Sequence, residues 1–157
     1  MKRITSIFLS IFFSVLFTVL MPINVYGQTN SSSCIINKYT IYLDDGSYYV
    51  TIISEVPSKS TKTGSKTTTH YGSSNNALWK VTVNGTFTYD GSSAICTSAS
   101  HSVTVYENNW YIHSQNSYKT SNKAIADVTM KKKYLGIVTS TKDVHLVLAC
   151  DKNGNLS

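Results

Sequence analysis

The sequence is poor in proline and lacks any segment with a convincing helical hydrophobic period. It has two prolines in 157 residues, and one of them, Pro22, lies in the apolar N-terminal region. Most turns are therefore left to Gly, Asn, Asp and Ser. The missing helical period argues against a helical fold. Turn signals instead recur about every ten to fifteen residues through 38–151, which is typical of an all-β chain.

Motifs for several kinds of chemistry are also missing. There is no G-x-S-x-G nucleophile motif and no glycine-rich phosphate loop. A zinc site usually includes a close-spaced pair of His or Cys ligands, and the chain has none. We therefore expect no metal, no cofactor, and scattered surface or cross-strand histidines. The four histidines are His70, His101, His113 and His145.

The carboxylates do not form an evident catalytic pair either. Most lie in turn contexts, where Asp is favoured because it hydrogen-bonds its own backbone. Asp127 is the exception, since it lies between Ala126 and Val128 in an alternating run. We expect it on a solvent-facing strand surface rather than in a catalytic site. The full set is Asp44, Asp45, Glu55, Asp90, Glu107, Asp127, Asp143 and Asp151.

The N-terminal region has the pattern of a secretory signal peptide. Lys2 and Arg3 precede an apolar run at 7–21, and Val25 and Gly27 stand at positions −3 and −1 of a cut before Gln28. An uncleaved anchor is less favoured, because the run is short for a bilayer of about 30 Å and no basic cluster follows. We therefore predict a signal peptide over 1–27, cleavage after Gly27, and a secreted mature protein without a membrane span.

The mature chain is expected to have a disordered leader at 28–37 and a single β domain at 38–157. Loss of Lys2 and Arg3 changes 14 basic and 8 acidic side chains to 12 and 8, which leaves a net charge of +4. This excess suits contact with anionic polymers. Nucleic acid is not expected, because no aromatic-interleaved basic motif is present. Lys131, Lys132 and Lys133 are the candidate anionic-polymer contact, or else protect a sheet edge.

Three cysteines remain after export, so one disulfide can form. Cys96–Cys150 is the favoured pair, because both residues lie in strand-like segments, whereas Cys34 lies in a polar stretch. Two alternatives stay open: all three thiols are free, or Cys34 pairs with one of the others or with another molecule.

Alternating residues predict several strands. Asp44-Asp45-Gly46-Ser47 separates two β-prone runs, 39–43 and 48–53, and predicts a hairpin. The clearest strand is 77–89, where apolar residues from Trp79 to Tyr89 alternate with polar ones and Gly85 allows a bend or bulge. The Ser, Thr and Lys-rich span 55–66 is predicted as a linker or edge segment. The expected fold is an antiparallel β-sandwich of immunoglobulin-like architecture, or a small barrel, with seven or eight strands.

Cys96, Trp110 and Cys150 are similar to the immunoglobulin pattern of a Trp packed on an inter-sheet disulfide. Leu148 stands where that family has Tyr, and few residues follow Cys150. This similarity supports a sandwich rather than membership of that family.

A further resemblance rests on three stretches: 62–67 (KTGSKT), 77–99 with its Trp-x-Val-x-Val-x-Gly-x-Phe-x-Tyr strand, and the ending 149–157 (ACDKNGNLS). Together with the two late cysteines, they resemble a group of small exported proteins of Gram-positive bacteria. The resemblance implies a bacterial, extracellular, β-rich protein, and the group has no established activity or catalytic residues. Cys34 departs from that group's pattern.

These observations favour a secreted, non-enzymatic binding or interaction module, held near the anionic cell envelope by its basic residues. Its partner would be a cell-wall polymer, a glycan or a protein surface. Two alternatives remain: an exported antagonistic factor, such as a bacteriocin or toxin, and a small secreted hydrolase. A hydrolase would need a pocket with at least two perturbed titratable groups.

Overall fold

The computed structural model describes residues 33–56 and 60–157. The predicted signal peptide, 1–27, lies outside the described residues. Eight strands are present: β1 (Cys34–Tyr42), β2 (Tyr48–Val56), β3 (Thr61–Tyr71), β4 (Ala77–Tyr89), β5 (Ala94–Val105), β6 (Trp110–Thr120), β7 (Lys123–Tyr134) and β8 (Ile137–Ala149).

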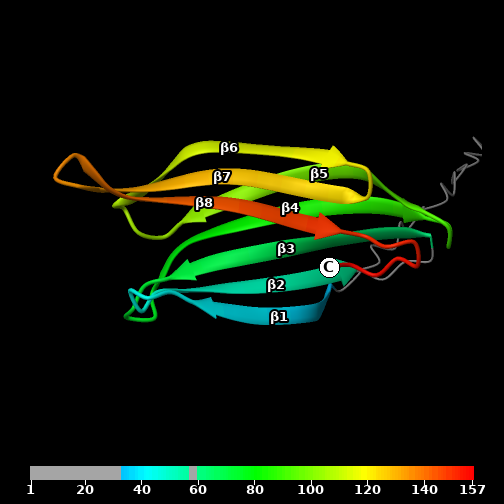
Figure 1. Ribbon diagram of the computed structural model, residues 1–157, viewed down its shortest axis with the longest axis horizontal. Coiled ribbons are helices and arrows are strands. Elements are labelled where there is room, and N and C mark those ends of the chain that lie inside the picture. The colour runs from blue at the N-terminus through cyan, green and yellow to red at the C-terminus, as the bar shows by residue number, and fades with distance from the viewer. Residues whose placement is uncertain (1–32, 57–59) are drawn as a thin grey trace, which may run out of the picture.

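The strands form two antiparallel sheets that pack face to face (Figure 1). One sheet has five strands in the order β1-β2-β3-β4-β5, and the other has three in the order β6-β7-β8. Every neighbouring pair is antiparallel and consecutive in sequence. Among the described residues no strand pair joins the two sheets, so the predicted β-sandwich is confirmed and the barrel alternative is wrong.

The core lies between the inner faces of the two sheets. Trp79, Val81, Val83 and Phe87 of β4 are fully buried, and the polar residues between them face outward, as the alternation predicted. The opposite layer is supplied by alternate residues of β7 and β8. Burying one such side chain contributes roughly 1.5–3 kcal/mol. The main residues of that layer are Ala124, Ala126, Val128, Met130, Leu146 and Leu148.

Within 55–66, predicted as a linker or edge segment, residues 55–56 instead end β2 and residues 61–66 begin β3, while 57–59 lie outside the described residues. Thr61–Tyr71 is β3, which lies between β2 and β4 in the five-stranded sheet. Its inner face holds Lys62, whose Nζ lies 3.1 Å from Oε1 of Glu55 on β2. Farther along, Leu156 of the C-terminal tail covers Gly64. The polar composition hid this strand, because its inner face is completed by an ion pair and a distant leucine.

β1 also begins earlier than predicted. The leader was expected over 28–37, but Cys34 pairs with Glu55 and Asn37 pairs with Ile53, so residues 34–37 are already strand. A register shift between Ile35 and Asn37 marks a bulge in this pairing.

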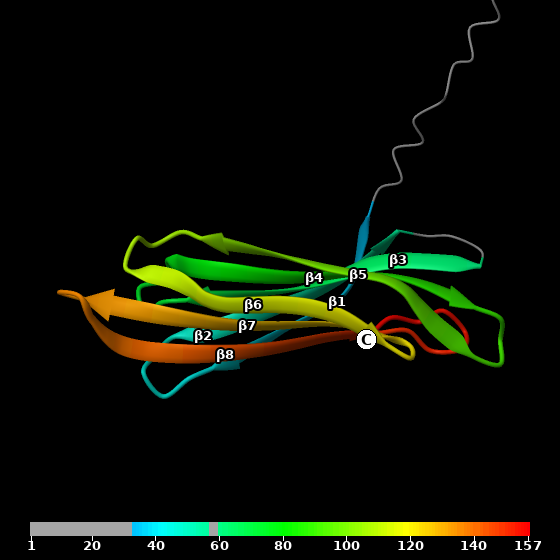
Figure 2. The same ribbon diagram turned by 90° about the horizontal axis from the view of Figure 1, so that it is seen from above.

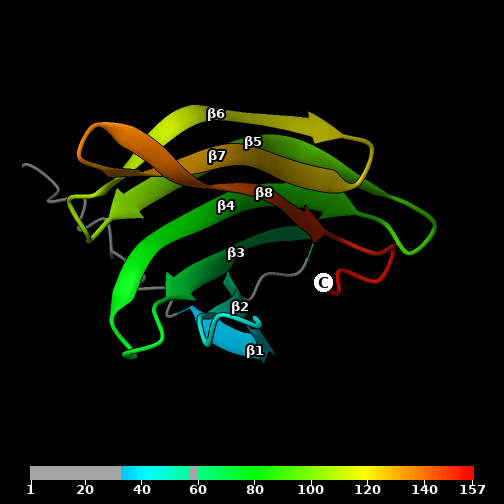
Figure 3. The ribbon, with the colours of Figure 1, turned by 60° about the vertical axis from the view of Figure 1, so that its left-hand side comes forward.

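The five-stranded sheet extends beyond the three-stranded one on the β1 side. Close contacts of β1 are made with β2 alone, while β8 reaches β3 and β4. All nine residues of β1 are exposed. Figures 2 and 3 show the wider sheet twisting away, with β1 and β2 at its far end. One strip of its inner face therefore has no covering layer among the described residues.

The predicted Cys96–Cys150 disulfide is wrong, because both cysteines are free, as is Cys34. Cys96 and Cys150 are buried in the core, but their backbone N–H groups donate to Ser121 and Asn122, the two residues of the β6–β7 turn. Each thiol donates to a nearby carbonyl, at 3.2 Å for Cys96 and 3.5 Å for Cys150. Both segments are therefore attached to the same turn, without a disulfide between them.

Candidate functional site

Four connections meet at one end of the sandwich. Because consecutive strands are antiparallel, the β1–β2, β3–β4, β5–β6 and β7–β8 connections all fall on the same side, the left in Figure 1. We call this the hairpin end. Clustered loops at the end of a rigid sandwich are a frequent place for binding sites.

A cavity of about 380 Å³ opens at the hairpin end. Ser47 comes from the β1–β2 turn and His70 from β3. Trp110 begins β6, whereas Lys132 and Lys142 come from β7 and β8. Both sheets and two of the four connections, β1–β2 and β3–β4, therefore contribute to its walls.

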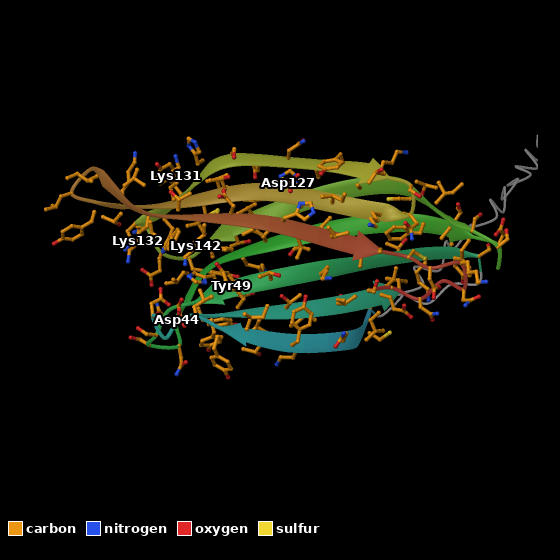
Figure 4. The ribbon with its side chains drawn as sticks, in the orientation of Figure 1. Asp44, Tyr49, Asp127, Lys131, Lys132 and Lys142 are labelled. Carbon is orange, nitrogen blue, oxygen red and sulfur yellow. The ribbon has the colours of Figure 1, made fainter. Side chains whose placement is uncertain are left out.

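The two lysines point into the sandwich rather than outward. Lys132 pairs across the sheet with Trp110, and Lys142 pairs with Met130, whose side chains are both buried in the core. Cross-strand partners share one face, so both lysines are on the inner face, and both are half-buried. Neither forms an ion pair with any described residue. Figure 4 shows them near the β1–β2 turn at the hairpin end.

Beside the lysines, four aromatic rings form a cluster on the inner face. The His70 ring centroid lies 4.6 Å from Tyr49, 5.0 Å from Trp79 and 5.9 Å from Trp110. The Trp79 and Trp110 centroids are 6.0 Å apart and meet edge to face. Such tilted and edge-on contacts are favourable for aromatic rings.

Three buried ring nitrogens in this cluster have no hydrogen-bond partner among the described residues: His70 Nδ1, Trp79 Nε1 and Trp110 Nε1. His70 and Trp110, which are 2% and 5% exposed, also line the cavity. A buried polar atom without a partner costs free energy and calls for an explanation, such as a bound water or ligand.

Burial lowers the pKa of His70 to about 4, and the positive charge of Lys142 acts in the same direction. The imidazole is therefore neutral at pH 7. Burial also raises the pKa of Tyr49.

Asp45 is the acidic residue of the cavity wall. Its Oδ1 accepts hydrogen bonds from Ser47 Oγ at 2.5 Å and from Ser47 N at 3.0 Å. These bonds lower the pKa of Asp45, with a smaller contribution from Lys142. With His70 neutral, the wall has two positive charges and one negative charge, which favours an anion.

The structure separates the three lysines predicted as one contact. Lys131 pairs with Tyr111 and Thr141 on the outer face, opposite to Lys132. Lys133 returns to the outer face by the ordinary alternation of the strand, and its Nζ lies 4.5 Å from the Tyr111 ring centroid. The run 131–133 thus presents lysines to both faces of the sheet.

Asp127 lies on the outer face of the three-stranded sheet, where the alternation predicted it. Its Oδ1 lies 2.5 Å from Nδ1 of His145, and both side chains are largely exposed. Nearby, the Thr129 hydroxyl donates to Asp143 at 2.6 Å. These four side chains line a shallow cavity of about 340 Å³. Within the described ranges, no hydroxyl or thiol hydrogen-bonds to His145.

The remaining histidines do not gather around either site. His101 lies on β5 and His113 on β6. No group of three His, Cys, Asp or Glu side chains that could hold a metal ion is found among the described residues.

The sequence predicted Lys132 as a contact residue but not the face of the strand on which it lies. Lys142, Trp110 and His70 were not predicted as site residues. Two of the four carried a readable signal. Lys132 continues the inward series that ends at Met130, and Lys142 precedes the inward series that begins at Val144, each in phase. His70 had no such signal, because its strand has no clear alternation.

Comparison of the chain with family models, curated proteins and solved structures finds no match. In the described part of the chain, no helix has the length and hydrophobicity to cross a membrane. By its fold, the protein is an antiparallel β-sandwich with a cavity at one end.

Proposed function

We propose that this protein is a secreted, non-enzymatic binding module that attaches to an anionic polymer of the cell envelope through its hairpin end. The observation that carries this proposal is the pair Lys132 and Lys142, which point into a cavity without any ion-pair partner among the described residues. Secretion rests on the signal-peptide pattern of residues 1–27.

Lys132 and Lys142 are half-buried in the wall of a cavity and have no counter-ion among the described residues. A charged group that loses part of its hydration is normally paired. Lys62 shows the ordinary arrangement, since it is bonded to Glu55. Lys132 and Lys142 therefore resemble one half of an ion pair whose other half is a ligand.

The outer face of the same hairpin adds further charge. Lys131 and Lys133 flank Tyr111 on the opposite surface of β7, close to the cavity along the strand. A flexible anionic chain that enters the cavity can also contact these two outer-face lysines. Such surface contacts are weak and screened by salt.

The test is co-sedimentation of the purified protein with cell walls of a Gram-positive bacterium at low and high salt. We expect binding at low salt that weakens as the ionic strength rises, because screening shortens the range of the charges. Replacing both cavity lysines, Lys132→Gln with Lys142→Gln, should lower the bound fraction at every salt concentration.

The matched control replaces two lysines on the outer face of the five-stranded sheet, Lys38→Gln with Lys80→Gln, which removes the same charge. This variant should retain the wild-type bound fraction to within about twofold, as expected for distant surface charges. No binding of the wild-type protein to walls, or equal losses in the two double variants, would contradict the proposal.

A further inference from the structure

We propose that the cavity at the hairpin end binds one phosphorylated polyol or sugar unit, with the phosphate held between Lys132 and Lys142. This inference rests on the proposed function and names the chemical unit of the polymer that the cavity recognises. It assigns separate parts of the unit to separate walls of the cavity.

The position of the two lysines indicates a single shared anion. Lys132 pairs with Ser140 and Lys142 pairs with Met130, so the lysines are diagonal neighbours on the inner face of adjacent antiparallel strands. Diagonal neighbours are about 7–8 Å apart and within reach of long side chains. Two ammonium groups on such neighbouring side chains repel each other, and an anion bound between them offsets that repulsion. A phosphate group can accept hydrogen bonds from both ammonium groups at once.

The other walls suit the hydroxyl groups of the same unit. Ser47, Ser73, Thr139 and Ser140 line the cavity. A hydroxyl can both donate and accept, so these side chains can pair with a polyol or a sugar in more than one orientation. The volume of about 380 Å³ falls in the usual range for small-molecule sites.

The aromatic side supplies further polar groups. Trp110 lines the cavity, its Nε1 has no partner, and an indole N–H can only donate. His70 is neutral and has an unpartnered Nδ1 beside it. A small adjustment of these side chains on binding would give both nitrogens partners from the ligand, which a purely apolar ligand could not do.

Asp45 limits the number of anionic groups that the cavity accepts. Its carboxylate lines the cavity and is held in the turn by Ser47. A second phosphate on the same small ligand would face this negative charge. The cavity therefore favours a unit with one phosphate over a bisphosphate.

The experiment is isothermal titration of the purified protein with glycerol 3-phosphate, inorganic phosphate and glycerol. We expect one site per chain for glycerol 3-phosphate, binding at least about fivefold weaker for inorganic phosphate, and no detectable binding of glycerol. Inorganic phosphate that binds as tightly as glycerol 3-phosphate would contradict the polyol part of the proposal.

Adjacent residues provide the matched control. Lys132→Gln should weaken glycerol 3-phosphate binding by about tenfold or more, because a charged hydrogen bond is lost, whereas Lys131→Gln on the outer face should change it less than about twofold. Trp110→Phe removes the indole N–H and should weaken binding, with some loss of thermal stability because Phe is smaller than Trp in a packed site. Equal effects of Lys132→Gln and Lys131→Gln would overturn the site.

The two proposals can fail separately. Wall binding that depends on salt, combined with no binding of glycerol 3-phosphate, would overturn the cavity site and leave attachment by surface charge. Binding of glycerol 3-phosphate that Lys132→Gln removes, combined with no wall binding, would retain the site and overturn the proposed function.

Discussion

His70 packs between the rings of Tyr49 and Trp79, where solvent has almost no access to its imidazole. Protonation would place a charge in this aromatic cluster, with Lys142 near enough to oppose it. The cluster therefore keeps the imidazole neutral, and the cationic charge of the cavity comes from lysine. A ligand bound at neutral pH meets fixed positive charges on one wall and uncharged ring nitrogens on another.

The lowered pKa of His70 predicts a stability loss in mild acid. The folded-state pKa is about 4 against an ordinary 6.5. Between these values the unfolded chain binds a proton that the folded protein does not bind, so the free energy of unfolding falls as pH falls through this window. The whole shift corresponds to roughly 3 kcal/mol. Urea unfolding at pH 7 and pH 4.5 measures most of it.

His70→Phe is the control, because it keeps a ring and removes the titrating group. Its unfolding free energy should change much less between these pH values. The carboxylates with lowered pKa, Asp45, Asp90 and Asp151, lose their contribution only at lower pH, below their ordinary 3.8. A wild-type stability that is flat from pH 7 to 4.5 would contradict the burial of a neutral imidazole.

The cysteines predict an ordered pattern of alkylation. Cys34 is exposed on β1, whereas Cys96 and Cys150 are buried and burial raises the pKa of both thiols. Since the thiolate is the reactive form, iodoacetamide should modify Cys34 in the folded protein and the other two only in denaturant. Peptide mass spectrometry counts the modified sites. A single modification in denaturant without reductant would show that Cys96 and Cys150 are joined after all.

At the scale of single elements, strands were predictable where one face is apolar. The strand over 77–89 was predicted with the bounds that β4 has, because Trp79, Val81, Val83 and Phe87 alternate with polar residues. β3 was missed because its inner face holds Lys62, Gly64 and Thr68, whose burial depends on partners distant in sequence. Thr68 bonds to Thr51 at 2.8 Å, for example. No local pattern carries that information.

β1 should be the least protected strand in the sandwich. Its residues are all exposed, and it contacts only β2. Local opening of such an edge strand breaks few buried contacts. We expect hydrogen exchange monitored by mass spectrometry to show fast exchange in β1 and slow exchange in β4 and β7. Equal protection of β1 and β4 would mean that another surface covers β1.

At the scale of the whole molecule, the site exists because distant segments meet. His70, Trp110 and Lys142 belong to three different strands from two sheets. Alternation in the sequence predicts which face each lysine takes, but it does not predict which turns meet at one end or which strands lie opposite each other. Those relations follow from sheet order and layer packing, so the cavity could not be derived from the sequence.

The same arrangement explains how a modest net charge gives a localised site. Among the described lysines, Lys62 alone is ion-paired, while Lys119 donates to the Thr97 carbonyl and Lys133 lies over the Tyr111 ring. What distinguishes Lys132 and Lys142 from the other described lysines is that they line the cavity beside the aromatic cluster. The account therefore depends on position rather than on total charge.

The most direct measurement compares two double variants of equal charge in binding to a soluble polyglycerol phosphate polymer. Lys132→Gln with Lys142→Gln removes the inner pair, and Lys131→Gln with Lys133→Gln removes the outer pair. We expect the inner variant to lose about tenfold or more in affinity and the outer variant about two- to threefold, since charged hydrogen bonds in a partly dry site exceed screened surface contacts. Equal losses would show that the polymer senses charge alone and would contradict the cavity as its binding site.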